Sequence, residues 1–257
     1  MKQTIYRSIN RILLIIFLVT LVSCKHIQLV TQAQDNFNKA ANIENELALE
    51  IDYADISKFS NASINYEIAY NLSSKALKNH KNRLKKDGLL GTAYSIKALS
   101  AWKLGEFNKA DALSKEALEE LSNQPRDIAL MKAIPGLIKA EQAFLKLGED
   151  DNITIEKYNE IKGLITNPAT GALNDITNAS NGLDKGHPLL TYFQLARVSM
   201  LLTLDRADLR SGQNDATFVK NEVIKGLKGL KNLVGCNSST FKKFFDELGS
   251  PGQVGCP

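Results

Sequence analysis

The sequence predicts an all-α fold. Apolar residues recur at every third or fourth position over most of the chain, which is the period of an amphipathic helix, and almost no stretch alternates as a half-buried strand does. Hydrophobic residues make up 44% of the 257 positions. A chain of this size and composition can bury a substantial core in one or two domains.

The first half of the chain contains the clearest helices. We expect a helical run over about 29–56, a helix that includes 66–77, and a pair of helices within 88–121. Gly105 stands between the two helices of that pair and can adopt the left-handed conformation that ends a helix. A tight antiparallel hairpin is therefore expected there.

The second half is less regular, and Pro135 lies within one of its helices. A proline inside a helix removes a backbone donor, so that helix is either kinked or begins anew at Pro135. Residues 169–185 are rich in Asn, Gly, Thr and Ser, and we expect a loop with room for a short helix. The expected helices are 127–147, 153–165, 189–204, 216–234 and 240–248.

The sequence repeats itself internally. Tyr66, Ala69, Leu72 and Ala76-Leu77 have the spacing of Phe107, Ala110, Leu113 and Ala117-Leu118, 41 positions later. Leu145-Lys-Leu-Gly148 matches Trp102-Lys-Leu-Gly105 in its last three residues, at an offset of 43. Such self-similarity is typical of stacked helical units.

The segment 94–118 resembles a tetratricopeptide (TPR) repeat, with a Leu-Gly turn and small residues where two helices must approach closely. The resemblance implies a superhelix of antiparallel hairpins. Both offsets exceed the TPR period of about 34 residues by about two helical turns, so longer helices are expected. The expected repeat-packing residues are Tyr66, Ala69, Leu72, Ala76, Tyr94, Ala98, Trp102, Leu104, Gly105, Phe107, Ala110 and Ala117.

The N-terminus resembles the leader of a bacterial lipoprotein. Three cations precede an apolar run over 12–22, which is too short to cross a hydrocarbon core of about 30 Å as a helix. Ser23 supplies the small residue before the thiol of Cys24. The resemblance implies a cleaved signal peptide over 1–23, lipidation of Cys24, a tether over 24–30 and a single domain over 31–257. Lys25 follows the cysteine in place of Asp, which implies the outer membrane, facing the periplasm.

Two further cysteines, Cys236 and Cys256, lie near the C-terminus. We interpret them as a disulfide, which would close a loop of about twenty residues and stabilise the fold by about 3 kcal/mol. The alternatives are two buried thiols or half of a metal site. The spacing and the absence of a nearby histidine disfavour the metal.

Composition and motifs argue against several function classes. The net charge is +4, but the leader holds three of the cations and no acid, so the rest carries +1 and nucleic acid is not indicated. No catalytic or nucleotide-binding motif is present, and the histidines His26, His80 and His187 are scattered. The acidic turn 149–152 lacks the spacing of a calcium loop, and a helix cap by Asn152 or Thr154 explains it better. We therefore expect no enzyme, metal or cofactor.

One basic cluster has two possible explanations. Lys78, His80, Lys81, Arg83, Lys85 and Lys86 lie at the C-terminal end of an expected helix. Cations are favoured there by the helix dipole. A basic patch close to a membrane could also contact an anionic surface, through Lys81, Arg83, Lys85 and Lys86.

These observations favour binding over catalysis. TPR-like proteins bind extended peptides or partner proteins in the groove lined by the first helices of each pair. The alternative is an accessory subunit of a periplasmic binding-protein-dependent transporter, of the TRAP-associated type, which would handle a small ligand. A cell-wall hydrolase would need a cleft with a perturbed acidic residue.

Overall fold

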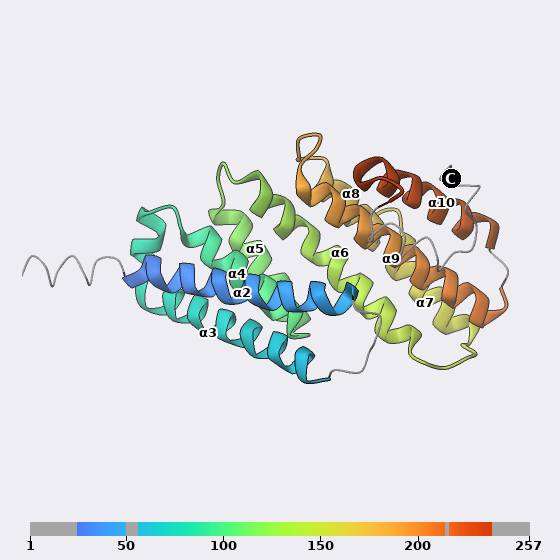
Figure 1. Cartoon of the computed structure of the whole chain (residues 1–257), viewed down its shortest axis with the longest axis horizontal. Coiled ribbons are helices and arrows are strands. Elements are labelled where there is room, and N and C mark those ends of the chain that lie inside the picture. Colours follow the sequence, from blue (N-terminus) through green and yellow to red (C-terminus); the bar gives the residue numbers. More distant parts are fainter. Residues whose placement is uncertain (1–24, 50–55, 214–215, 238–257) are drawn as a thin grey trace, which may run out of the picture. The chain divides into compact units, whose positions relative to one another are not determined.

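The structure, a computed structural model, describes residues 25–49, 56–213 and 216–237, and every regular element among them is a helix (Figure 1). The all-α prediction is confirmed. The helices group into two compact units, Met1–Leu121 and Ser122–Pro257, where we expected one continuous domain over 31–257. No helix within the described ranges is both long enough and apolar enough to cross a membrane.

The first unit is built from two helical hairpins, in which α3 packs against both α2 and α4 (Figure 1). Its helices are α2 (Lys25–Leu49), α3 (Ile56–Lys86), α4 (Leu90–Lys103) and α5 (Phe107–Glu120).

Glycines in the left-handed conformation end α3 and α4. Gly105 has φ +75°, and the next amide, of Glu106, donates to the carbonyl of Ala101 at 2.9 Å. Gly88 has φ +69°, and the amide of Leu89 donates to the carbonyl of Leu84 at 2.8 Å. Both patterns satisfy carbonyls at the helix end that would otherwise lack partners. The prediction that Gly105 ends a helix is confirmed.

Small residues form the contacts inside the first unit. Ala69, Ala76, Ala98, Ala110 and Ala117 are all completely buried. Tyr66 and Tyr94 are also buried, as expected of packing residues. In contrast, the side chains of Leu72, Trp102, Leu104 and Phe107 are only half-buried, and Gly105 lies exposed in the turn.

A polar network joins three helices of the first unit. The Glu44 carboxylate on α2 accepts a hydrogen bond from the hydroxyl of Tyr66 on α3 at 2.9 Å. The same oxygen pairs with the ammonium of Lys103 on α4 at 2.5 Å. Tyr66 is 1% exposed, and its ring centroid lies 5.2 Å from that of Phe37 on α2. The network therefore joins α2, α3 and α4 at a partly buried position.

The second unit contains five helices among the described residues. α6 continues through Pro135 as a single helix, so a new start at that proline was wrong. α8 is a short helix inside the loop that we expected over 169–185. α9 extends beyond Leu204, where we expected it to end. The bounds are α6 (Pro125–Leu147), α7 (Ile155–Thr166), α8 (Ala172–Ser180), α9 (Pro188–Ser211) and α10 (Ala216–Val234).

Glycines also allow close packing in the second unit. A Cβ on Gly136 of α6 would lie 2.8 Å from the Cβ of Asp175 and 3.0 Å from the carbonyl oxygen of Ala172, on α8. On α10, a Cβ at Gly226 would lie 3.2 Å from Val198 of α9. Gln194 of α9 donates to the Gly226 carbonyl at 2.6 Å. The α6–α8 pair therefore depends on the absence of a side chain at Gly136, and the α9–α10 pair is tightly packed at Gly226.

Candidate functional site

The chain folds immediately after the expected lipidation site. Cys24 and the leader lie outside the described residues, but α2 begins at Lys25, and His26, Leu29 and Val30 are buried. We expected a tether over 24–30, and this was wrong for the described part of that range. The reason is tertiary, because α2 packs against α3 and the apolar residues of its first two turns are buried.

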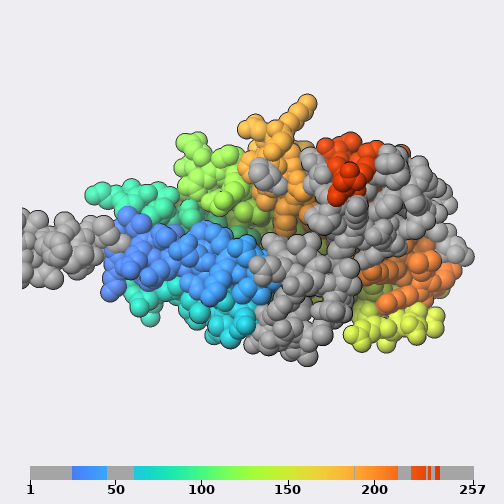
Figure 2. Space-filling model, in the orientation of Figure 1, coloured from blue at the N-terminus to red at the C-terminus, as the bar shows by residue number. Residues whose placement is uncertain are grey.

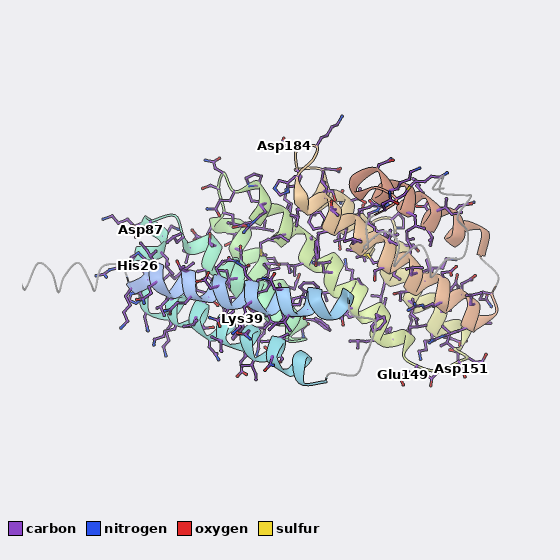
Figure 3. All side chains as sticks on the ribbon, viewed as in Figure 1. His26, Lys39, Asp87, Glu149, Asp151 and Asp184 are labelled. Carbon is purple, nitrogen blue, oxygen red and sulfur yellow. The ribbon has the colours of Figure 1, made fainter. Side chains whose placement is uncertain are left out.

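His26 connects the start of α2 to the end of α3. Its side chain is buried, and its Nε2 lies 2.5 Å from the Asp87 carboxylate, in the turn that follows α3. Figure 3 shows the two residues side by side. The other ring nitrogen, Nδ1, is buried without a hydrogen-bond partner. The histidine was expected in the tether, but it instead holds the first turn of α2 against the α3–α4 turn.

His80 lies beside this contact and interrupts α3. Its backbone has φ −137° and ψ 18°, which is not helical, and its ring centroid lies 6.1 Å from that of His26. Burial, and then the positive charges of His26, Arg83 and Lys25, lower the pKa of His80 below its ordinary value. The neutral ring is therefore favoured at this position.

The four cations that we predicted as an anionic-surface contact, Lys81, Arg83, Lys85 and Lys86, are all exposed on the last turns of α3. Lys85 pairs with Glu120 of α5 at 3.1 Å. The Lys81 ammonium lies 5.8 Å from the Tyr94 ring centroid, and its hydrogen bond to Tyr94 raises the pKa of Lys81. Burial raises the pKa of Tyr94, with a further contribution from its hydrogen bond to Glu116. We call this end of α3, from Lys78 to Lys86, the basic extension.

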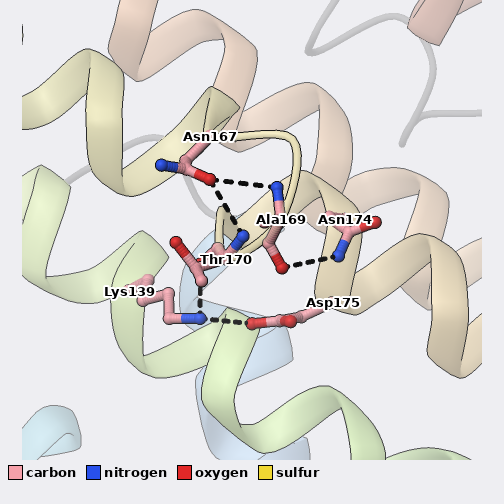
Figure 4. Close-up of polar contacts among 6 residues, drawn as sticks. All are labelled: Lys139, Asn167, Ala169, Thr170, Asn174 and Asp175. Atoms are coloured by element: carbon pink, nitrogen blue, oxygen red, sulfur yellow. Dashed lines mark hydrogen bonds and ion pairs between the residues drawn. The ribbon is translucent and has the colours of Figure 1, made fainter.

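The second unit has an open surface depression of about 340 Å³ between α6 and α7. At one side, the Lys139 ammonium donates to the Thr170 carbonyl and to the Asp175 carboxylate, both at 2.6 Å (Figure 4). Lys146 pairs with Glu160 at 2.5 Å on another side. Both lysines that line the depression thus already have carboxylate partners.

The loop beside the depression is held by its own polar groups. The Asn167 side-chain oxygen accepts from the amides of Ala169 and Thr170, each at 3.0 Å, and the Asn174 amide donates to the Ala169 carbonyl at 3.2 Å (Figure 4). These bonds, together with the Lys139–Asp175 pair, connect α6 to the start of α8. We interpret the cluster as a structural clamp. Sequence reasoning missed it because Lys139 and Asp175 are 36 residues apart.

The remaining polar candidates have structural roles. Thr154 caps α7 by accepting the amide of Lys157 at 3.2 Å, which confirms one of the two expected caps. His187 accepts the amide of Leu189 at 3.1 Å at the start of α9. Within the described ranges, no three His, Cys, Asp or Glu side chains are grouped as metal ligands. Cys236 follows α10, while Cys256 lies outside the described residues, so the disulfide stays a prediction.

Comparisons with protein-family models, with curated proteins and with solved structures found no match to this chain.

We expect His80 to make the folded chain less stable in acid. Its pKa lies below the ordinary value of 6.5, so the folded chain binds this proton more weakly than the unfolded chain. Protonation of His80 should therefore leave the free energy of unfolding unchanged at about pH 7. It should lower that free energy as the pH falls through about 6.5. Urea unfolding at about pH 7 and about pH 5 measures this loss, which should be smaller in His80→Gln. An equal loss in wild type and variant would contradict the assignment.

Proposed function

We propose that the chain is a membrane-tethered envelope lipoprotein whose helical hairpins form a TPR-like module for protein interaction or assembly. The main support for a protein-interaction module is the equivalence of α3 and α5. Each is the second helix of its hairpin, and each buries two alanines that share the same spacing. The tether rests on the sequence around Cys24.

The buried alanines support this equivalence. Ala69 and Ala76 on α3 correspond to Ala110 and Ala117 on α5, and all four have no exposed surface. The leucines differ between the two helices, since Leu77 and Leu113 are buried, each with 8% exposure, whereas their equivalents Leu118 and Leu72 are half-buried. Alanine at such positions permits a close approach of neighbouring helices, as stacked hairpins require.

The order of packing in the first unit is also compatible with stacking. α3 contacts the first helix of its own hairpin and the first helix of the next, and α2 and α4 contact each other as well. In the second unit, Gly148 ends α6 with φ +62°, and Leu147-Gly148 there matches Leu104-Gly105 in the sequence repeat. α6 and α7 would then form a third hairpin of the same kind.

The first helices offer a surface for a partner. Asp35, Asn38 and Lys39 are exposed on α2, and Figure 2 shows the blue surface of this helix open to solvent. Figure 3 shows Lys39 on the same helix. Alternating charged and amide groups suit an extended peptide or a polar protein surface. We therefore propose a protein partner for the α2 face.

We expect radioactive palmitate to label the wild-type chain in bacterial cells and not the Cys24→Ala variant. The thiol of Cys24 is the nucleophile that would accept lipid, and alanine has none. Labelling is read from the purified full-length proteins, and Cys236→Ala serves as the matched control that keeps Cys24. Equal labelling of wild type and Cys24→Ala would exclude acylation at this position.

We expect the α2 face to determine which protein the chain binds. A variant with Asp35→Arg and Lys39→Glu should recover a directly bound partner from detergent-solubilised membranes about tenfold less well than wild type, because it reverses both charges. The variant with Glu67→Arg and Lys75→Glu makes the same exchange on exposed positions of α3 and should bind as wild type does.

Two results would contradict the scaffold proposal. One is equal recovery of every partner by wild type and the α2 variant. The other is recovery of a transporter subunit as the direct partner, which would favour the ligand-handling role instead.

A further inference from the structure

The basic extension contains the part of α3 that exceeds the repeat. α3 continues nine residues beyond Leu77, to Lys86, whereas α5 continues two residues beyond the equivalent Leu118, to Glu120. The difference of seven residues equals the excess of the 41-residue offset over the TPR period of about 34. These residues add about 10 Å of helix at one end of α3. The excess in the offset is thus local, and α4 and α5 have 14 residues each.

Positive charge is concentrated on this added segment. Lys78, Lys81, Arg83, Lys85 and Lys86 are all exposed, and Lys25 at the start of α2 is exposed as well. The acidic groups at this end are Glu120, which pairs with Lys85, Glu116, whose charge acts on Lys81, and Asp87, which pairs with His26. Counted without the histidines, the end of the unit therefore carries an excess of three positive charges. The helix dipole favours cations here, but it does not require a helix longer than the repeat.

The cations also lie at the point where the folded chain begins. The His26–Asp87 contact of 2.5 Å holds the first turn of α2 against the turn that follows the basic extension. Lys25 is one residue after Cys24, and the helix starts there without an intervening tether. An acyl chain on Cys24 would place this end of the unit within a few residues of the headgroups. Cations within about a Debye length of an anionic surface are attracted to it.

We propose that the basic extension of α3, together with Lys25, docks the first unit onto anionic lipid headgroups of the membrane that holds the chain. This inference rests on the proposed lipid tether. The acyl group supplies attachment, and the cations supply orientation, since contact at this end directs the length of α2 and α3 away from the bilayer. Two such signals together give stable anchoring where one weak signal would not.

The test uses the mature, unacylated chain from residue 24 with Cys24→Ser. We expect it to sediment with vesicles of phosphatidylcholine and phosphatidylglycerol, not with phosphatidylcholine alone, and to be released by salt. Replacing Lys81, Arg83, Lys85 and Lys86 with Gln should weaken binding at least about tenfold. Circular dichroism checks that the variants remain helical.

Two further variants separate charge from structure. Lys81→Arg, Lys85→Arg and Lys86→Arg together retain the charge and should retain binding. The matched control replaces Lys132, Lys185, Lys225 and Lys228, exposed lysines of the second unit, with Gln and should bind as the parent chain does.

The results distinguish the docking from the tether. Unchanged vesicle binding in the four-Gln variant, or an equal loss in the matched control, would overturn the docking. Binding to a soluble polyanion such as heparin without binding to vesicles would overturn it too. Loss of palmitate labelling alone would remove the tether and leave the vesicle result standing, whereas labelling without vesicle binding would remove only the docking.

Discussion

The close approach of helices at alanine positions is the constraint on which the first unit depends. Ala69, Ala76, Ala110 and Ala117 have no exposed surface, and each occupies a place where a larger side chain would meet the neighbouring helix. Because these positions face inward, the opposite, polar faces of α3 and α5 are directed to solvent. The Glu44–Tyr66–Lys103 network is then brought to the interface of three helices, where its partners satisfy each other.

Local features could be predicted from the sequence, and long-range polar contacts could not. Periodicity and the glycine at position 105 located α4 and α5 closely, because helix formation and termination depend on neighbouring residues. The His26–Asp87 contact joins residues 61 apart, and no spacing rule relates them. The tether over 24–30 was wrong for the described residues because the pairing of Leu29 and Val30 with α3 is tertiary. The candidate basic cluster was visible in the sequence, but its place beside Lys25 was not.

In the docking that we propose, the length of α3 would connect the repeat to the membrane. If α3 ended two residues after Leu77, as α5 ends two residues after Leu118, it would lack most of the cations. It would also not reach Asp87, the partner of His26. About two additional turns of α3 add positive charge at the end of the unit where α2 starts. The backbone of His80 interrupts the helix in this segment, and its ring centroid lies 6.1 Å from that of His26 on α2. The proposed lipid attachment, the proposed docking surface and the exposed α2 face thus all belong to a single hairpin.

Leucine substitution at the matched alanines tests the central claim most directly. Ala76→Leu on α3 and Ala117→Leu on α5 should each lower the free energy of unfolding by about 1–3 kcal/mol in urea titrations, because both positions are tightly packed. Ala112→Leu, at an exposed position of α5, should change it by less than about 0.5 kcal/mol. If Ala76→Leu and Ala117→Leu were tolerated as well as Ala112→Leu, the two helices would not occupy equivalent packed places and the stacked-hairpin account would be contradicted.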